Sequence, residues 1–249
     1  MPLSDYKTAL VTGASSGIGA ATVRALAGRG IQSYALARRE ERLQTLADET
    51  GCTPLALDLR GRDAIYERLT ALDVDIVVGN AGTGRGMEGL LSASPDDIET
   101  TLGVNVVSLV HMLRAVLPGM VERGRGHVIN IGSTAGLYPL YSAIYGASKG
   151  AVHLLNQNLR IELKGSGVRT TEILPGRVVT EIFDVSFDDK EKAAAMKDPG
   201  IEQLQPEDIA DAIIFALDAP WRMNVNMIEI QPTEQIFGGI TMAASAPRR

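Results

Sequence analysis

The run Thr12-Gly13-Ala14-Ser15-Ser16-Gly17-Ile18-Gly19 constrains the fold of this chain more than any other feature. It follows a short β-branched run and opens a helical stretch. Glycines at this spacing allow a tight turn, a close approach of the backbone to a pyrophosphate, and close packing of the helix on the strand. The helix N-terminus also offers free N–H groups to phosphates. The run therefore predicts a dinucleotide site that includes Gly13, Ser15, Ser16, Gly17, Ile18 and Gly19.

Short apolar runs alternate with longer helical stretches along the rest of the chain. The runs are apolar on both faces, as is typical of parallel strands covered by helices on both sides. The pattern predicts an α/β fold, a Rossmann-type doubly wound parallel sheet of about seven strands with helices on both faces. The expected strands are Thr8–Thr12, Ser33–Ala37, Pro54–Leu57, Ile76–Val78, Val128–Ile131, Arg169–Leu174 and Asn226–Ile230.

Composition limits the classes of function. A chain of 249 residues with 45% hydrophobic content buries a large core, and no composition shift divides it, so we expect one domain over residues 1–249. The net charge of −6 argues against nucleic acid as a partner. The lone Cys52 excludes an internal disulfide, and the sequence lacks a long uninterrupted apolar run, so we expect a cytoplasmic protein outside the membrane. His111, His127 and His153 stand far apart without flanking ligands, so we expect no metal site.

Two predicted helices are long, about Asp96–Glu122 and Leu140–Leu163, and carry more apolar positions than one sheet face needs. They favour packing against a second subunit, as a homodimer or homotetramer. The charged stretch Phe183–Gln205 interrupts the alternation, and two readings stay open for it: a mobile flap over the substrate, or a solvated helix and loop without function. Pro206 begins a helix to about Leu217.

Polar residues follow the third and fourth expected strands. Asp58, next to Leu59, ends the third strand, and Asn80-Ala81-Gly82 ends the fourth. Ligands bind at the carboxyl ends of strands in such sheets, so both positions extend the predicted cofactor site. Taken alone, Asp58 is equally well a helix cap and Asn80 a turn residue.

The chemistry of the site is indicated by Tyr145 and Lys149. They are four residues apart on a predicted helix and so share one face, and Ser133 ends the fifth strand. A tyrosine is a poor acid–base group at its usual pKa, but a neighbouring lysine cation favours the phenolate and lowers that pKa. We therefore expect the side chains of Ser133, Tyr145 and Lys149 to converge on one point.

The end of the second strand, Tyr34-Ala-Leu-Ala-Arg-Arg-Glu40, bears on the choice of cofactor. In NAD enzymes of this architecture an acidic residue there accepts from the ribose 2′-hydroxyl, whereas here Ala37 takes that place. Arg38 and Arg39 follow at once, and a guanidinium binds phosphate through parallel charged hydrogen bonds. The sequence predicts NADP, with NAD the weaker candidate; the alternative is that both arginines are simply a solvated helix start.

In order and spacing these motifs resemble those of the short-chain dehydrogenase/reductase family over nearly the whole chain. The resemblance rests on Thr12–Gly19, Asn80–Gly82, Ser133, Tyr145-Gly-Ala-Ser-Lys149 and Pro175-Gly-Arg-Val-Val-Thr180. It implies that Tyr145 is the general acid/base, that Lys149 holds the ribose and tunes Tyr145, and that Ser133 orients the substrate oxygen. It further implies that Asn105 supports a water in a proton relay. Pro175, Gly176, Val178 and Thr180 match the segment that clasps the nicotinamide.

The resemblance predicts an NADP(H)-dependent oxidoreductase that transfers a hydride between nicotinamide and a small alcohol or carbonyl compound. The C-terminal run Ile228–Gln235 is loosely similar to the ending of 3-hydroxy-acid, serine and clavaldehyde dehydrogenases, which favours a hydroxy acid or aldehyde. Arg85 is a candidate contact for an anionic substrate, with plain solvent exposure as its alternative. Gly79 departs from the family, where many members carry a second asparagine, and this puts one local hydrogen bond in doubt.

Two rival functions remain. A dinucleotide-sensing protein without catalysis would share the fold, although such a protein would be expected to lose one of the reacting residues. Nucleotide-sugar epimerases share the Tyr/Lys pair but usually carry a longer C-terminal substrate domain, for which 249 residues leave no room.

Overall fold

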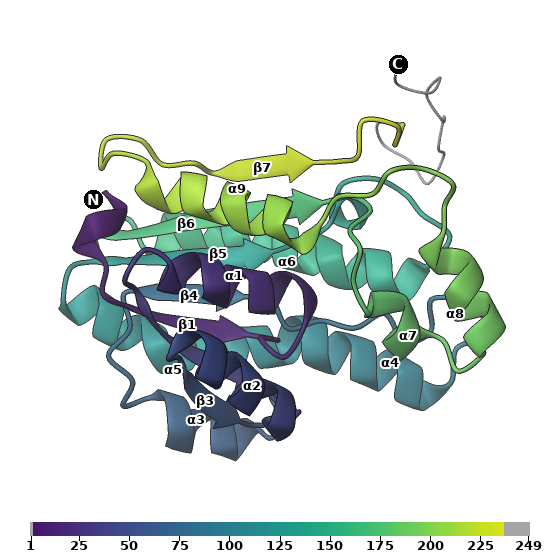
Figure 1. Cartoon of the computed structure of the whole chain (residues 1–249), viewed down its shortest axis with the longest axis horizontal. Coiled ribbons are helices and arrows are strands. Elements are labelled where there is room, and N and C mark those ends of the chain that lie inside the picture. The colour runs from purple at the N-terminus through teal and green to yellow at the C-terminus, as the bar shows by residue number, and fades with distance from the viewer. Residues whose placement is uncertain (1, 237–249) are drawn as a thin grey trace.

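The sheet predicted from the sequence is present in the structure, a computed structural model that describes residues 2–236. Seven parallel strands lie in the order β3-β2-β1-β4-β5-β6-β7. Figure 1 shows this sheet from β3 at one side to β7 at the other. The strands are β1 (Thr8–Thr12), β2 (Gln32–Ala37), β3 (Thr53–Ala56), β4 (Ile76–Gly79), β5 (Gly126–Ile131), β6 (Val168–Pro175) and β7 (Met227–Ile230). The predicted α/β class is confirmed, and each strand lies within two residues of its predicted bounds.

Burial follows the position of a strand in the sheet. Every residue of β4 and β5 is buried, whereas β3 and β7 are partly exposed along their whole length. β3 and β7 are the edge strands, with a neighbour on one side only. The expected burial on both faces is therefore right for the central strands and wrong for the two edges.

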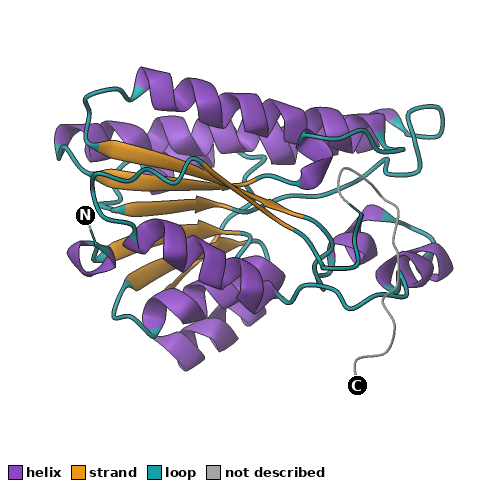
Figure 2. Cartoon of the chain, turned by 90° about the horizontal axis from the view of Figure 1, so that it is seen from above, coloured by secondary structure: helices purple, strands orange, loops and turns teal. Residues whose placement is uncertain are grey.

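Helices cover both faces of the sheet, as the view from above shows (Figure 2). Successive strand residues point to opposite faces, so Val11 joins one core cluster and Leu10 the other. The first cluster includes residues of α1 (Gly17–Ala27), α2 (Glu40–Thr50) and α9 (Pro206–Asp218). The second includes residues of α3 (Arg62–Leu69), α5 (Ser108–Glu122) and α6 (Ala143–Glu162). Short 3₁₀ turns occur at Leu3–Asp5 and Thr134–Gly136.

The long helix expected over Asp96–Glu122 is three consecutive segments. α4 (Pro95–Leu102) is followed by a π-helical turn, Gly103–Val107, and then by α5. The run Pro95–Glu122 is long and apolar enough to cross a membrane by length and composition alone. Its inward side chains, among them Met112 and Met120, pack in the core beside β4 and β5, as in the core helices of globular proteins.

The carboxyl ends of the strands point to the side of the molecule that carries α7 (Ile182–Ser186) and α8 (Lys190–Lys197), as Figure 1 shows. These two short helices form most of the predicted excursion Phe183–Gln205. Strand order reverses between β1 and β4, and ligands bind at such a switch point in open α/β sheets. The fold therefore directs attention to the edge between the glycine-rich turn and the α7–α8 segment.

A substitution at Gly19 tests the packing of α1 on this edge. A Cβ at Gly19 would overlap the Gly13 carbonyl and lie 2.8 Å from the Gly13 carbonyl carbon. Because backbone cannot move aside cheaply, we expect Gly19→Ala to lower the free energy of unfolding by about 1–3 kcal/mol, measured by urea denaturation. Gly28→Ala is the matched control, since Gly28 has φ −60° and its Cβ would make only an ordinary contact of 3.5 Å. Equal stability of the two variants would contradict the argument.

Candidate active site

Hydrogen bonds join the glycine-rich turn to the end of β4. The Asn80 amide nitrogen donates to the Thr12 carbonyl at 2.9 Å, and the Thr12 hydroxyl accepts from the backbone of both Asn80 and Ala81 at 3.0 Å. Gly13 and Gly17 take positive φ values of 67° and 52°, which favour glycine. Asn80 is thus more than a turn residue, because its side chain fixes the position of the turn before α1.

A cleft runs along this edge and gathers most of the predicted cofactor residues. Its walls include Gly13, Ser15, Ser16, Gly17, Ile18, Arg38, Arg39, Asp58, Leu59, Asn80, Ala81, Gly82 and Thr180. Gly19 lies behind the turn, where it gives α1 room to pack. Asp58 ion-pairs with Arg60 at 2.6 Å, and this hydrogen bond lowers the pKa of the Asp58 carboxyl although burial opposes the change.

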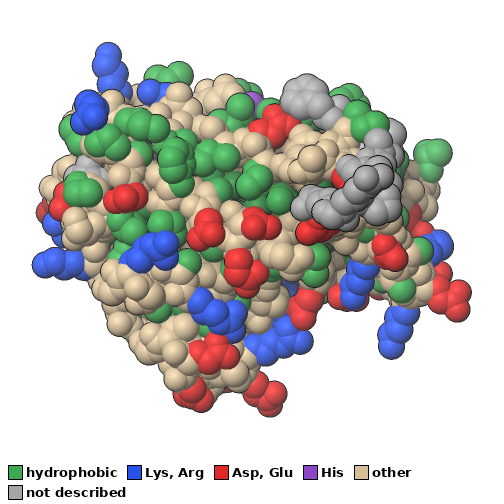
Figure 3. All heavy atoms as spheres, turned by 45° about the horizontal axis from the view of Figure 1, so that its top comes forward, with side chains coloured by type: hydrophobic (Ala, Val, Ile, Leu, Met, Phe, Trp, Pro, Cys, Tyr) green, Lys and Arg blue, Asp and Glu red, His purple; other side chains and the backbone are tan. Residues whose placement is uncertain are grey.

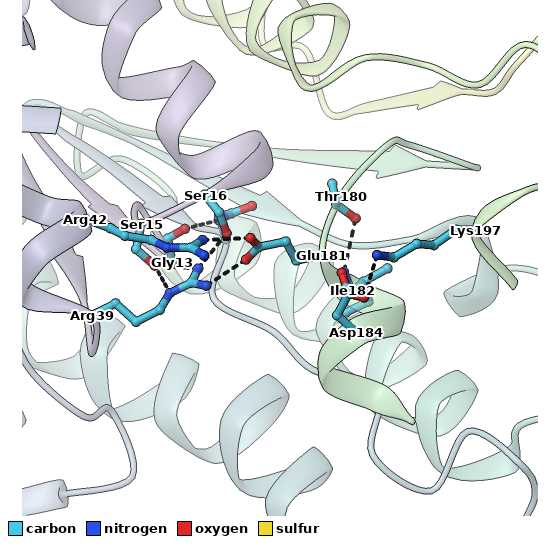
Figure 4. Close-up of polar contacts among 11 residues, drawn as sticks. Gly13, Ser15, Ser16, Arg39, Arg42, Thr180, Glu181, Ile182, Asp184 and Lys197 are labelled. Atoms are coloured by element: carbon cyan, nitrogen blue, oxygen red, sulfur yellow. Dashed lines mark hydrogen bonds and ion pairs between the residues drawn. The ribbon is translucent and has the colours of Figure 1, made fainter. Parts of the chain in front are cut away.

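At one end of the cleft two arginines hold a carboxylate (Figure 4). Arg39 donates to the hydroxyls of Ser15 and Ser16 at 2.7–3.0 Å and to Glu181 Oε2 at 2.7 Å, while Arg42 donates to Glu181 Oε1 at 2.6 Å. Burial opposes ionisation of Glu181, but the hydrogen bonds from Arg42 and Arg39 lower its pKa to about 2. This anion cradle, Arg39, Arg42, Ser15 and Ser16, supplies the donors that a phosphate needs.

The cradle differs in part from the sequence prediction. Arg38 lines the cleft with an exposed side chain, and the contacts to the carboxylate come from Arg39 and Arg42. The sequence analysis named Arg38 and Arg39 and missed both Arg42 and Glu181. The signal for Arg42 was available: it follows Arg39 by three residues, which places both on one face of the first turn of α2.

The predicted reacting residues come together beside the cleft. Ser133, Tyr145 and Lys149 line a second cavity, which shares Ile18, Asn80, Gly82 and Thr180 with the first. Lys149 follows Tyr145 by one turn of α6, and its Nζ lies 5.9 Å from the centre of the Tyr145 ring. Pro175, Gly176 and Val178 form another part of the same wall.

The electrostatics of the pair differ from expectation. Burial raises the pKa of the Tyr145 phenol, and its hydrogen bond with Ser133 only partly offsets this. Lys149 donates to the Ile131 carbonyl at 2.9 Å instead of reaching the phenol, and burial lowers the pKa of its ammonium to about 8. The expected lowering of the Tyr145 pKa by Lys149 is therefore absent in this arrangement, because burial dominates for both groups.

Asn105 lies in the π-helical turn and is 2% exposed. Its amide donates to the Thr83 carbonyl at 2.9 Å and to the Ser148 hydroxyl at 2.9 Å, while its oxygen accepts from the Thr83 backbone at 2.8 Å. A Cβ at Gly82 would lie 3.4 Å from Asn105 Oδ1 and 3.7 Å from Lys149 Nζ. Asn105 and Lys149 therefore converge behind Gly82.

A buried carboxylate near Lys149 escaped the sequence analysis. Glu172 on β6 is 1% exposed, and its Oε2 lies 2.7 Å from His153 Nδ1. Burial raises the pKa of Glu172, and its charge opposes the lowering of the Lys149 pKa. A glutamate inside an otherwise buried strand was the available signal, since such a group needs a partner.

Two other predictions concerned Gly79 and Arg85. Asn130 Oδ1, which faces Gly79, is buried and accepts no hydrogen bond within residues 2–236, in keeping with the local bond placed in doubt.

Arg85 donates to Asp97 at 2.8 Å and to Asp188 at 2.6 and 2.9 Å, with 27% of its side chain exposed. Arg85 is therefore neither a freely solvated side chain nor one that is available to a substrate anion, because two carboxylates already pair with it.

The three histidines lie apart and bond to Tyr66, Thr171 and Glu172 respectively. Within residues 2–236 no group of three or more His, Cys, Asp or Glu side chains is placed to hold a metal ion.

Comparisons with known proteins agree with this geometry. The model of the family described as short chain dehydrogenase matches residues 7–191. The NADP-dependent 3-hydroxy acid dehydrogenase YdfG of Escherichia coli (strain K12) is 42% identical over 242 residues, covering 94% of this chain and 98% of that protein. An uncharacterised short-chain type dehydrogenase/reductase, y4eK of Sinorhizobium fredii, is 38% identical over 243 residues, covering 97% and 98%. The closed form of a serine dehydrogenase complexed with NADP+ superposes with a TM-score of 0.88 at 41% identity, covering 96% of this chain and all of that one.

Glu181 occupies the anion cradle, so we expect it to compete with any phosphate that binds there. Exposed ion pairs contribute about 0.2–1 kcal/mol each, and two are lost in Glu181→Gln. The variant should therefore bind adenosine 2′,5′-bisphosphate about two- to thirty-fold more tightly than the wild type, measured by titration calorimetry. Adenosine 5′-phosphate should bind both proteins alike, and Glu40→Gln, which removes an exposed charge nearby, should change neither ligand. Weaker binding of the bisphosphate by Glu181→Gln would instead make Glu181 a support for the arginines.

Proposed function

This chain belongs to the short-chain dehydrogenase family, and from that premise we propose that it is an NADP(H)-dependent oxidoreductase that interconverts a small hydroxy acid and its carbonyl counterpart. The observation that carries the proposal is the shared wall of the two cavities. It places Ser133, Tyr145 and Lys149 next to the cleft at the switch point. A dinucleotide in the cleft would present its reactive end where these three side chains meet.

The cleft residues fit NADP better than NAD. β2 ends at Ala37 without a carboxylate to repel a 2′-phosphate. Arg39 and Arg42 follow this strand and form the anion cradle together with Ser15 and Ser16 of the glycine-rich turn. The backbone of Gly13–Gly19 and the N-terminus of α1 would hold the pyrophosphate. Thr180, with Pro175, Gly176 and Val178, would hold the nicotinamide end. The Escherichia coli relative is named as NADP-dependent, and the serine dehydrogenase structure is described as a complex with NADP+. Both names support the same choice.

The residues of the chain divide the acid–base work. Bound NADP(H) would supply the hydride acceptor or donor. In the oxidation direction Tyr145 takes the proton of the substrate hydroxyl, and in reduction it returns that proton to the carbonyl oxygen. Burial raises the pKa of Tyr145, so the resting phenol is protonated and ready to donate. Ser133 hydrogen-bonds the same substrate oxygen and so fixes its position.

Lys149 and Asn105 support the proton transfer by Tyr145. The Lys149 ammonium, 5.9 Å from the centre of the Tyr145 ring, would favour the phenolate as it forms during the reaction, although burial outweighs this effect in the resting arrangement. Glu172 helps Lys149 keep its proton. Asn105 holds the backbone of Thr83 near Lys149, and we infer that it supports a water that connects Lys149 to solvent.

The substrate class follows from two supports. Similar proteins are named for 3-hydroxy acids and for serine, which are hydroxy acids. The lining of the cavity beside Tyr145 includes Leu140, Tyr141 and Phe183, and these apolar and aromatic walls suit a small organic molecule. An aldehyde without a carboxylate is the runner-up. A sensing protein without catalysis would need none of the four reacting residues, and all four are present.

The proposal extends to the whole chain as one cytoplasmic domain, residues 1–249, and to assembly as a homodimer or homotetramer. α5 and α6 expose Val110 (42%), Leu154 (55%) and Ile161 (73%). Figure 3 shows hydrophobic side chains gathered on the face that carries α9 and β7. The exposed apolar residues of α9, β7 and the loop between them include Phe215, Trp221 and Met227. Both areas suit contact with identical chains. We further propose that residues 183–205 act as a substrate flap.

Replacement of the acid–base group tests the function directly. Tyr145→Phe should lose about 10²–10⁴-fold in turnover of a hydroxy acid with NADP+, while its dissociation constant for NADP+ stays within a few-fold of wild type. Turnover is measured by NADPH absorbance, and the dissociation constant is measured by fluorescence titration. Tyr34→Phe is the matched control, since Tyr34 lines neither cavity. Near-normal turnover by Tyr145→Phe, or a wild type that prefers NAD+, would contradict the proposal.

Assembly is tested by light scattering. We expect a mass of two or four times the 26.5 kDa of one chain at micromolar concentration. Leu154→Glu places a charge on the exposed face of α6 and should shift the population toward smaller species. A wild type that stays at 26.5 kDa would rule out assembly.

A further inference from the structure

Arg177 stands in the wall of the reacting cavity, two residues after the end of β6. It shares this wall with Ser133 and Tyr145. Its guanidinium carbon lies 4.7 Å from the centre of the Phe183 ring, and its Nη1 donates to the Met196 carbonyl at 2.7 Å. The side chain therefore lies between the wall of the cavity and the α7–α8 segment.

The hydrogen-bonding capacity of Arg177 is largely unused. A guanidinium has five N–H donors, and among residues 2–236 only the bond to Met196 engages one of them. No carboxylate of the described residues forms an ion pair with it. Burial lowers the pKa of Arg177, and only the phenol of Tyr141 opposes this. A partly buried cation without a counter-ion is costly, so this position is one that an anion would stabilise.

Arg85, which the sequence offered as a candidate contact for a substrate anion, lacks this property. Asp97 and Asp188 both accept from it, so its charge is already balanced. Arg39 and Arg42 likewise share Glu181. Of the arginines near the two cavities, Arg177 combines a place in the reacting cavity with a charge that no described carboxylate neutralises.

We propose that Arg177 binds the carboxylate of the substrate and so selects hydroxy acids over neutral alcohols. This rests on the proposed dehydrogenase function and deepens it. A carboxylate accepts two parallel N–H bonds from one guanidinium. With the carboxylate held by Arg177, the hydroxyl of the same molecule faces Ser133 and Tyr145. The ligand class is a small organic acid whose alcohol carbon lies within a few bonds of its carboxylate.

Arg177 also touches the α7–α8 segment through Phe183 and Met196, so its loss could act on the flap instead of the substrate. The two roles make different predictions. A flap role affects every substrate alike, whereas a carboxylate role affects acids and spares their esters. The test therefore compares 3-hydroxybutyrate with methyl 3-hydroxybutyrate, which differ in charge at the carboxyl group.

In Arg177→Met we expect kcat/KM with NADP+ for 3-hydroxybutyrate to fall about ten- to a hundred-fold, mainly through KM, because hydrogen bonds to a charged group are lost. The value for the methyl ester should stay within about three-fold of wild type. Arg177→Lys keeps the charge without the planar fork and should fall between. Arg85→Met is the matched control and should leave the ratio of acid to ester unchanged. The melting temperature and the NADP+ dissociation constant of each variant report on folding.

An equal fall for acid and ester, or no change for either, would overturn the proposal. A second readout does not depend on turnover: butyrate, an unreactive acid, should quench or enhance NADPH fluorescence in the wild-type complex and not in Arg177→Met, with butyramide as the neutral control. Wild type that turns over neither substrate yet binds butyrate through Arg177 would refute the proposed reaction while upholding the anion site. Wild type that binds no butyrate and does not favour the acid would refute the anion site alone.

Discussion

The site depends on the hydrogen bonds that join the ends of β1 and β4. These two strands are neighbours in the sheet, and their chains leave it toward opposite faces, which opens a crevice between them. Asn80 and Thr12 close the base of that crevice by exchanging bonds between side chains and backbone. The glycine-rich turn, the start of α1 and the loop with Gly82 are all fixed relative to this point. Neither cavity would keep its shape if the two strand ends moved apart.

Ion pairs hold the α7–α8 segment on the rest of the molecule. The segment with α7 and α8 is fastened to the body through Glu181 on Arg39 and Arg42, through Asp188 on Arg85, and through Lys192 on Glu88. These pairs are largely exposed, and each such pair is weak. The segment is therefore held by bonds that a competing anion can replace, in contrast to the apolar packing of the strands. This difference suits a part of the molecule that must admit and release ligands.

The reacting part of the site contains ionisable groups whose burial is electrostatically unfavourable. Lys149 and Glu172 are buried and Tyr145 is partly buried, and burial disfavours the charged form of each. Their proton affinities are therefore shifted away from ordinary values, which is a common property of catalytic groups. The hydrogen bond of Lys149 to the Ile131 carbonyl and that between Glu172 and His153 partly offset this unfavourable burial. Arg177 follows the same rule with one difference, since the described chain does not provide its anion.

The amino-acid sequence by itself determined the strands, the glycine-rich turn, the spacing of Tyr145 and Lys149 and the arrival of Asn80 at a strand end. Those features follow from local periodicity and backbone geometry, which act over a few residues. Only the tertiary structure decided how charges pair. Glu181 lies 142 positions from Arg39 and Asp188 lies 103 from Arg85, and no local pattern links them. The same holds for burial, which raises the pKa of Tyr145, whereas the sequence predicted that Lys149 would lower it. Pairing and burial depend on which distant segments meet, and that is known only once the chain is folded.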